Sequence, residues 1–181
     1  MLTTRDMVHV ALFAAIMAAL GLMPPIPVGF VPVPITAQSM GVMLAGAILG
    51  AKRGALAIVL FLALVAVGLP LLSGGRGGLG VFFGPTAGFL VSWPIGAFVT
   101  GWLTERFWKR LSFGHLLAAC AAGGIFVVYV IGIVGLSLIA GLPLEKAAAG
   151  SITFIPGDLI KVVIAAFVAK TVNRSYPVIR A

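Results

Sequence analysis

Charged residues are scarce in this sequence. Only 9% of the 181 residues are Asp, Glu, Lys or Arg, whereas 61% are hydrophobic, and the mean hydropathy is +1.22. A water-soluble domain of this size covers its surface with charged side chains, so this composition excludes one. Residues 54–75, 77–104 and 116–144 carry no charge at all. Each run is long enough to cross a hydrocarbon core of roughly 30 Å as a helix, which indicates an all-α integral membrane protein surrounded by the lipid bilayer.

Acidic residues are the rarest of the charged types, with 4 Asp and Glu against 12 Lys and Arg, which gives a formal net charge of +8. Such an excess of positive charge can indicate a protein that binds nucleic acid. Here the basic residues occur in small groups at the ends of apolar segments rather than along one polar face. Because no polar domain is present that could read DNA or RNA, we expect no nucleic-acid partner.

Residue types that support catalysis or metal binding are also few. The single cysteine, Cys120, lies in an apolar run, where a lone thiol usually packs as a small hydrophobic group. The two histidines, His9 and His115, have no cysteine or carboxylate cluster at ligand spacing nearby. The sequence also lacks G-x-x-x-x-G-K-[ST], so the chain cannot hydrolyse ATP by a P-loop mechanism. We therefore expect no enzyme activity, no metal and no cofactor.

Proline, glycine and charged residues divide the chain into six apolar segments. We predict transmembrane helices over about residues 4–23, 36–50, 54–69, 85–105, 114–140 and 152–173. The first of these resembles a signal peptide, but because further spans follow we interpret it as a retained helix. No polar linker is long enough to separate domains. The sequence therefore predicts one transmembrane domain of six helices over residues 1–181.

Basic residues are distributed unequally between the two sides that six helices would define. One side holds Arg5, Lys52, Arg53, Arg106, Lys109, Arg110, Lys170, Arg174 and Arg180. The other side holds only Arg76 and Lys146, and Lys161 falls within a predicted helix. Because cytoplasmic loops of membrane proteins are enriched in Lys and Arg, both termini are predicted to lie inside. A proline-rich loop (24–34) and a glycine-rich loop (71–84) then lie outside, beside the start of the sixth helix.

Two charged residues, Asp158 and Lys161, lie inside a predicted membrane helix. Charge within a bilayer is costly, so such residues are candidates for function. At a spacing of three they share one helix face and can pair. The pair either fixes helix packing or forms part of a recognition site in the outer half of the bundle. Pro156 and Gly157, next to the pair, are typical of interrupted membrane helices that line a cavity.

Two loops on the same side supply further candidate ligand-binding residues. Thr36 and Gln38 open the second helix and offer a hydroxyl and an amide, although Thr36 could equally cap that helix. The glycine-rich segment 73–80 contains Arg76 and Gly77, and it could cradle an anion or act as a flexible lid. Phe82 and Phe83, which follow it, are candidate walls of an apolar pocket.

Small residues recur on the first predicted helix, where Ala11, Ala15 and Ala19 are spaced four residues apart. Such a series lets another helix approach closely. The partner could be a helix of the same chain or a helix of another protein.

Four motifs, in order, carry a resemblance to a known family. They are residues 33–38 (Val-Pro-Ile-Thr-Ala-Gln), 68–70 (Gly-Leu-Pro), 83–89 (Phe-Gly-Pro-Thr-Ala-Gly-Phe) and 154–161 (Phe-Ile-Pro-Gly-Asp-Leu-Ile-Lys). On these motifs the chain resembles the BioY family, the biotin-specific S components of energy-coupling factor (ECF) transporters, over nearly its whole length. The family commonly has Gly and Tyr where this chain has Ala87 and Phe89, so Phe89 brings no hydroxyl to a ligand site.

The resemblance implies a six-helix S component in a prokaryotic cell membrane that captures biotin from outside. It also implies a transmembrane scaffold (T) component and two cytoplasmic ABC ATPases as partners, with Ala11, Ala15 and Ala19 facing the scaffold. Asp158 and Lys161 would bind the ureido ring of biotin, and Arg76 with its glycine-rich loop would bind the tail carboxylate. In an alternative pose, Lys161 pairs with the tail carboxylate.

Three other functions remain open from the residues alone. The chain could be an S component for another vitamin, because specificity depends on a few side chains of a shared fold. Asp158 and Lys161 could instead form a relay in a small proton- or ion-coupled channel. Finally, the chain could be a membrane scaffold without a ligand, in which the charged pair only fixes packing.

Overall fold

The computed structural model describes residues 3–29 and 32–179, and within them the protein is helical without a β-strand. The α-helices are α1 (Thr4–Gly21), α2 (Gln38–Leu49), α3 (Ala51–Ala66), α4 (Ala87–Arg106), α5 (Phe113–Ala121), α6 (Val128–Ala140), α7 (Leu144–Ile152) and α8 (Ile155–Ser175). A π-helical segment, η3 (Ala122–Val127), joins α5 to α6, and two short 3₁₀ turns, η1 (Leu79–Phe82) and η2 (Trp108–Arg110), lie in connections.

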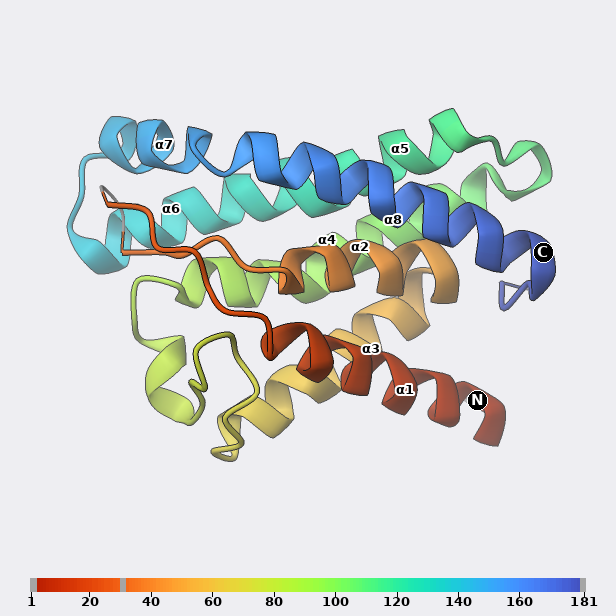
Figure 1. Cartoon of the computed structure of the whole chain (residues 1–181), viewed down its shortest axis with the longest axis horizontal. Helices are drawn as coiled ribbons and strands as arrows, with labels where there is room; N and C mark the ends of the chain where they lie inside the picture. Colours follow the sequence, from red (N-terminus) through yellow and green to blue (C-terminus); the bar gives the residue numbers. More distant parts are fainter. Residues whose placement is uncertain (1–2, 30–31, 180–181) are drawn as a thin grey trace.

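The helices form a bundle in which both termini lie at the same end (Figure 1). Helix α4 lies at the centre and packs against α2, α3 and α6. Helix α2 is enclosed by its neighbours, so that every residue from Gly41 to Leu49 is buried. The loop between α1 and α2 and the loop between α3 and α4 lie at the end opposite the termini (Figure 1). The same-end placement of the termini agrees with the predicted topology, in which that end faces the cytoplasm.

The predicted count of six spans is not confirmed, because two of the helices are short. Three helical stretches are long and apolar enough to cross a membrane: α1, α4 and the continuous stretch Phe113–Ala140. Helices α7 and α8 together give a fourth, bent by 55°. Helix α2 has 12 residues and extends only about 18 Å, and α3 has 16, against about 20 needed for a full span.

The turn between α2 and α3 is tighter than the sequence predicts. Gly50 turns the chain with a φ of +86°, and α3 begins at Ala51, so Lys52 and Arg53 lie in its first turn rather than in a loop. A side chain at Gly50 would collide with the Glu105 carboxylate, which accepts a 2.9 Å hydrogen bond from the Ala51 N–H. Glycine is required here both for its conformation and for this close approach.

The predicted helix 114–140 contains a π-helical segment where it crosses α4. Gly123 packs against Gly96 and Thr100 of α4, and Gly124 packs against Met43 of α2, with no room for a side chain at either glycine. One additional residue in the turn rotates the rest of the helix relative to its first part. Residues that follow, including Tyr129, thereby face the interior of the bundle.

Candidate ligand-binding site

A cavity of about 70 Å³ lies between α2, α4, α6 and α8 at the end of the bundle opposite the termini, and the hollow amounts to about 630 Å³ when its open mouth is included. It is lined by Val33, Pro34, Ile35, Thr36, Gln38, Ser39, Leu72, Arg76, Thr86, Phe89, Leu90, Trp93, Gly124, Val128, Tyr129, Phe154, Asp158 and Lys161. Most of this lining is apolar, with polar groups at two separate places.

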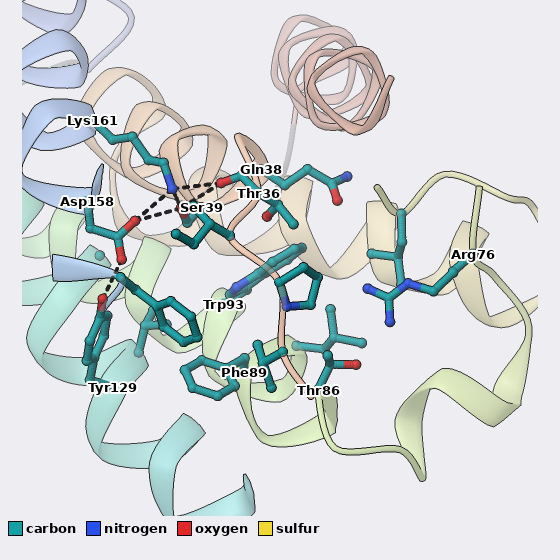
Figure 2. A pocket seen from close by; sticks show the side chains of 18 residues that line it. Thr36, Gln38, Ser39, Arg76, Thr86, Phe89, Trp93, Tyr129, Asp158 and Lys161 are labelled. Atoms are coloured by element: carbon teal, nitrogen blue, oxygen red, sulfur yellow. Dashed lines mark hydrogen bonds and ion pairs between the residues drawn. The ribbon is translucent and has the colours of Figure 1, made fainter. Parts of the chain in front are cut away.

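The first polar group is a cluster around Asp158 and Lys161 (Figure 2). The Lys161 Nζ donates to Asp158 Oδ1 at 2.8 Å, to the Thr36 carbonyl at 2.7 Å and to Ser39 Oγ at 3.0 Å. The Tyr129 hydroxyl donates to the other oxygen, Asp158 Oδ2, at 2.6 Å. Asp158 is only 5% exposed. The Ser39 hydroxyl also lies 3.3 Å from Asp158 Oδ1. The ammonium has thus engaged all three of its donors, whereas the carboxylate, which can accept about four hydrogen bonds, keeps room for one more, on Oδ2.

The start of α8 explains why a carboxylate is tolerated at this depth. The chain bends between Ile152 and Ile155, so α8 begins beside the cavity, and Asp158 lies in its first turn. Anionic side chains are favoured near the positive end of a helix dipole. The break lies just before Pro156, which occupies the first turn of a regular helix, rather than at the Pro156–Gly157 pair itself.

The second polar group lies across the cavity from the first and consists of Arg76 and Thr86 (Figure 2). Arg76 is largely exposed, and its Nε donates to the Ser73 carbonyl at 3.3 Å. The guanidinium therefore keeps donors that can bind an anion at the mouth of the cavity. The Asp158–Lys161 pair thus lies at the inner end of the cavity, and the Arg76 guanidinium lies at its outer end.

Aromatic rings form the wall between these two polar groups. Phe89, Tyr129 and Phe154 contact one another edge to face, with ring centroids 6.4–6.5 Å apart, and Trp93 is 6% exposed. Phe89 lines the cavity and, as the sequence indicates, brings no hydroxyl to it. Phe82 and Phe83 do not: Phe83 is 78% exposed, and Phe82 is half-buried against the core outside the cavity.

The comparisons with known proteins agree over almost the whole chain. Residues 1–178 match the model of the BioY family. This chain belongs to the BioY family. It is 56% identical to the "Biotin transporter BioY" of Rhizobium etli over 99% of both chains. It is 53% identical to that of Rhodobacter capsulatus over 96% of this chain and 95% of the relative.

A solved crystal structure has the same fold as this chain. The crystal structure of "the S-component for biotin from an ECF-type ABC transporter" superimposes with a TM-score of 0.91. It is 33% identical in sequence and covers 96% of this chain and 95% of its own. The fold class predicted from the sequence, an all-α membrane bundle of the S-component type, is thereby confirmed.

Three of the residues singled out in the sequence, of which Thr36 and Gln38 line the cavity, have contacts that the sequence did not indicate. Gln38 is buried, and its amide donates to the Met17 and Leu71 carbonyls and accepts from the Ser73 N–H, each at 3.0 Å. It therefore braces the glycine-rich loop against α1. Thr36 supplies its backbone carbonyl to Lys161 and does not cap α2, whose first flanking residue is Ala37. Gly77 lines a separate hollow beside Arg76.

Several cavity residues were missed by the sequence analysis: Ser39, Thr86, Trp93, Tyr129 and Phe154. Tyr129 carried a signal, because it is one of two tyrosines in the chain and stands in a 29-residue run without charge. Ser39 lies three residues beyond Thr36 and reaches the same helix face. Thr86 and Phe154 lie in two of the four motifs that carry the family resemblance, although neither was assigned to the site. Trp93 lies in an apolar run where nothing in the sequence distinguishes it from core residues.

The alanine series of the first helix faces outward. Ala11, Ala15 and Ala19 are exposed on α1, whereas Phe13 and Met17 face the core. Packing within the same chain therefore does not account for the series.

Within residues 3–29 and 32–179, no group of three His, Cys, Asp or Glu side chains could hold a metal ion.

Proposed function

We propose that this chain captures biotin from outside the cell as the membrane-embedded S component of an ECF-type transporter. The observation that carries the proposal is a cavity with a carboxylate–ammonium pair at one end and a guanidinium at the other, in a member of the BioY family. The chain is a multi-pass protein of the plasma membrane and is not an enzyme. We further propose that residues 1–181 act as one substrate-binding domain with both termini inside.

Biotin has chemistry that complements this cavity. Its ureido ring presents two N–H donors and one carbonyl acceptor, and its tail ends in a carboxylate. Asp158 has room for one ureido N–H on Oδ2, and for the second only if the Ser39 hydroxyl, 3.3 Å from Oδ1, turns away. Lys161 can donate to the ureido oxygen only by exchanging one of its present bonds, of which the Ser39 contact at 3.0 Å is the longest. Arg76 would bind the tail carboxylate at the mouth, and the aromatic wall would bury the rings.

The pose with Lys161 on the tail carboxylate receives less support. In that pose the ureido ring would lie near Arg76 and Thr86, where no anionic acceptor lines the cavity. The Asp158 carboxylate would then be left close to the tail carboxylate, and like charges at short range repel. We therefore favour the pose in which the ureido ring lies at the inner end.

We propose that transport requires a T component and two cytoplasmic ABC ATPases, which would supply the energy that this chain cannot. The exposed series Ala11, Ala15 and Ala19 on α1 supports a close helix–helix contact with the T component. An Ala15→Leu variant is expected to lose co-purification with the T component while it still binds biotin. Ala118→Leu, at an exposed alanine on α5, is the matched control and should keep both properties.

The test of the ligand is a titration of the purified, detergent-solubilised protein with biotin. Tryptophan fluorescence reports on the cavity because Trp93 lines it, and calorimetry gives the stoichiometry. We expect saturable one-to-one binding that is displaced by analogues with an intact ureido ring and not by thiamine or riboflavin. Displacement by another vitamin would instead indicate a different substrate. An absence of saturable binding, or uptake driven by a pH gradient without ATPases, would overturn the proposal.

A further inference from the structure

A second region of the molecule, far from the biotin cavity, has the features of a binding site. It lies at the end with both termini, where α5 begins and α8 ends, and these two helices run side by side (Figure 1). Two adjacent hollows share Lys170 and Arg174 there. The first is otherwise lined by Phe113, Phe167, Thr171 and Ser175, and the second by Trp108, Leu111, Leu116 and Asn173.

The charge of this region is uncompensated. Neither hollow is lined by an Asp or Glu, and within the described residues the ion pairs join Arg53 to Asp6 and Lys161 to Asp158. Within this described part of the chain, Lys170 contacts an aromatic ring rather than an acid: its Nζ lies 5.8 Å from the centre of the Phe113 ring. Two cations side by side without an acid attract an anion from outside the chain.

The surface next to these cations is apolar and exposed. On α8, Ile160, Ile164 and Phe167 are 63%, 44% and 64% exposed. Thr171 and Arg174 continue the same face, because the five positions are spaced alternately by four and three residues. The face therefore changes from hydrocarbon-like to cationic along its length. A soluble anion matches only its end, whereas a phospholipid matches the whole face.

A buried polar atom adds to this picture. Asn173 is 9% exposed; its Nδ2 donates to the Ala47 carbonyl at 3.0 Å, while its Oδ1 is buried without a hydrogen-bond partner. Since Asn173 lines the second hollow, this oxygen can accept a hydrogen bond from a hydroxyl on a bound headgroup. Trp108 is typical of the membrane–water interface at which such a headgroup lies.

We propose that the groove between the start of α5 and the end of α8 binds an anionic phospholipid with a hydroxylated headgroup, of the phosphatidylglycerol type. Lys170 and Arg174 bind its phosphate, Asn173 accepts from a headgroup hydroxyl, and an acyl chain lies along Phe167, Ile164 and Ile160. The site is independent of biotin, because it is at the other end of the bundle from Asp158.

The experiment is native mass spectrometry of the detergent-released protein after incubation with phosphatidylglycerol, phosphatidylserine or phosphatidylcholine. We expect a one-to-one adduct with phosphatidylglycerol in preference to both other lipids. A double variant, Lys170→Gln with Arg174→Gln, is expected to bind phosphatidylglycerol about 25-fold more weakly, because each basic residue near an anionic lipid contributes about fivefold. The matched control, Lys52→Gln with Arg106→Gln, removes two charges at the same end outside the groove and should bind as the wild type does.

Other outcomes would overturn the proposal in recognisable ways. Equal binding of the three lipids, or an unchanged affinity in the Lys170/Arg174 double variant, would exclude the site. If inorganic phosphate or glycerol phosphate displaced the lipid at concentrations similar to that of the lipid itself, the groove would bind an anion without using the apolar face of Ile160, Ile164 and Phe167. Should the double variant not fold, Phe167→Ser serves instead. The Phe167 side chain is exposed, so its removal is expected to weaken lipid binding without affecting the core.

Discussion

Two ion pairs of this protein look alike and differ in what surrounds them. Lys161 and Asp158 are 2.8 Å apart, with side chains 14% and 8% exposed, while Arg53 and Asp6 are 3.0 Å apart, with side chains 19% and 20% exposed. The first pair borders an aromatic-walled cavity and binds Thr36, Ser39 and Tyr129 in addition. The second lies at the opposite end of the molecule.

The surroundings of the Arg53–Asp6 pair are those of a structural contact. The Arg53 Nη2 donates to the Val178 carbonyl at 3.1 Å, and Asp6 accepts from the Thr3 N–H and hydroxyl at the start of α1. The pair thus links α1 and α3 to the C-terminal segment. This pair also borders a hollow, so neither the length of an ion pair, nor its burial, nor a neighbouring hollow distinguishes the two cases. What distinguishes the Asp158–Lys161 pair is the aromatic wall of the cavity that it borders.

Removing the carboxylate at the cavity is expected to have the largest effect. Asp158→Ala takes away the proposed acceptor of the ureido N–H groups and leaves the Lys161 ammonium uncompensated. A hydrogen bond to a charged group is worth about 1.5–3 kcal/mol, and an unpaired buried charge adds a further cost. We expect the Kd for biotin to rise at least about 100-fold, measured by calorimetry, in a protein that remains folded in detergent.

The shape-conserving variant Asp158→Asn separates charge from size. It keeps an acceptor for one ureido N–H and is expected to bind more tightly than Asp158→Ala but more weakly than the wild type. Wild-type affinity in Asp158→Ala would rule out the recognition role and return the pair to a packing function.

A smaller effect is expected from Tyr129→Phe. The hydroxyl donates to Asp158 Oδ2 at 2.6 Å and fixes the direction of the carboxylate, while the ring remains in the aromatic wall. Loss of one hydrogen bond to a charged group predicts a Kd about tenfold higher. The control is Tyr176→Phe, the only other tyrosine, which bonds Arg5 at the far end of the bundle. Equal losses in both variants would show that the effect is not local to the cavity.

The fold could be anticipated from the sequence to the level of apolar segments but not to their lengths. The charge-free runs define α4 and the stretch Phe113–Ala140 well, since a helix must satisfy its own backbone in lipid. The π-helical segment was missed because Gly123 and Gly124 are forced into it by contacts with α4 and α2, which no local pattern records. Helix α7 was missed for a similar reason, because it continues toward α8 only after a 55° bend.

The candidate site could be anticipated mainly where a charged residue was out of place in its segment. Asp158 and Lys161 were found because charge in an apolar run is costly, and Arg76 because it interrupts a glycine-rich loop. Gln38 was assigned to the ligand, whereas its amide is used within the protein, since hydrogen-bond partners 33 and 35 residues away cannot be read from the chain. Trp93 could not be separated from the core at all.

At the mouth of the cavity, Arg76→Ala is expected to weaken binding of biotin more than binding of a biotin amide. The guanidinium is exposed, so its pairing with the tail carboxylate is worth no more than about 1 kcal/mol, which corresponds to roughly fivefold in Kd. Competition titrations with both ligands measure the difference. Lys146→Ala, the other basic residue at that end, is the control. Equal losses for acid and amide would exclude the tail-carboxylate assignment.

The smallest effect on binding is expected from Asp6→Asn, which breaks the other ion pair. This substitution removes the charge that faces Arg53 but leaves the bond from Arg53 to the Val178 carbonyl. Because Asp6 is far from the cavity, biotin should bind with unchanged affinity while the thermal unfolding midpoint falls slightly. The comparison with Asp158→Asn is direct, since both variants replace one paired carboxylate by an amide of the same size. If Asp6→Asn weakened biotin binding as much as Asp158→Asn does, the losses would reflect the stability of the bundle, and the distinction between a binding pair and a structural pair would fail.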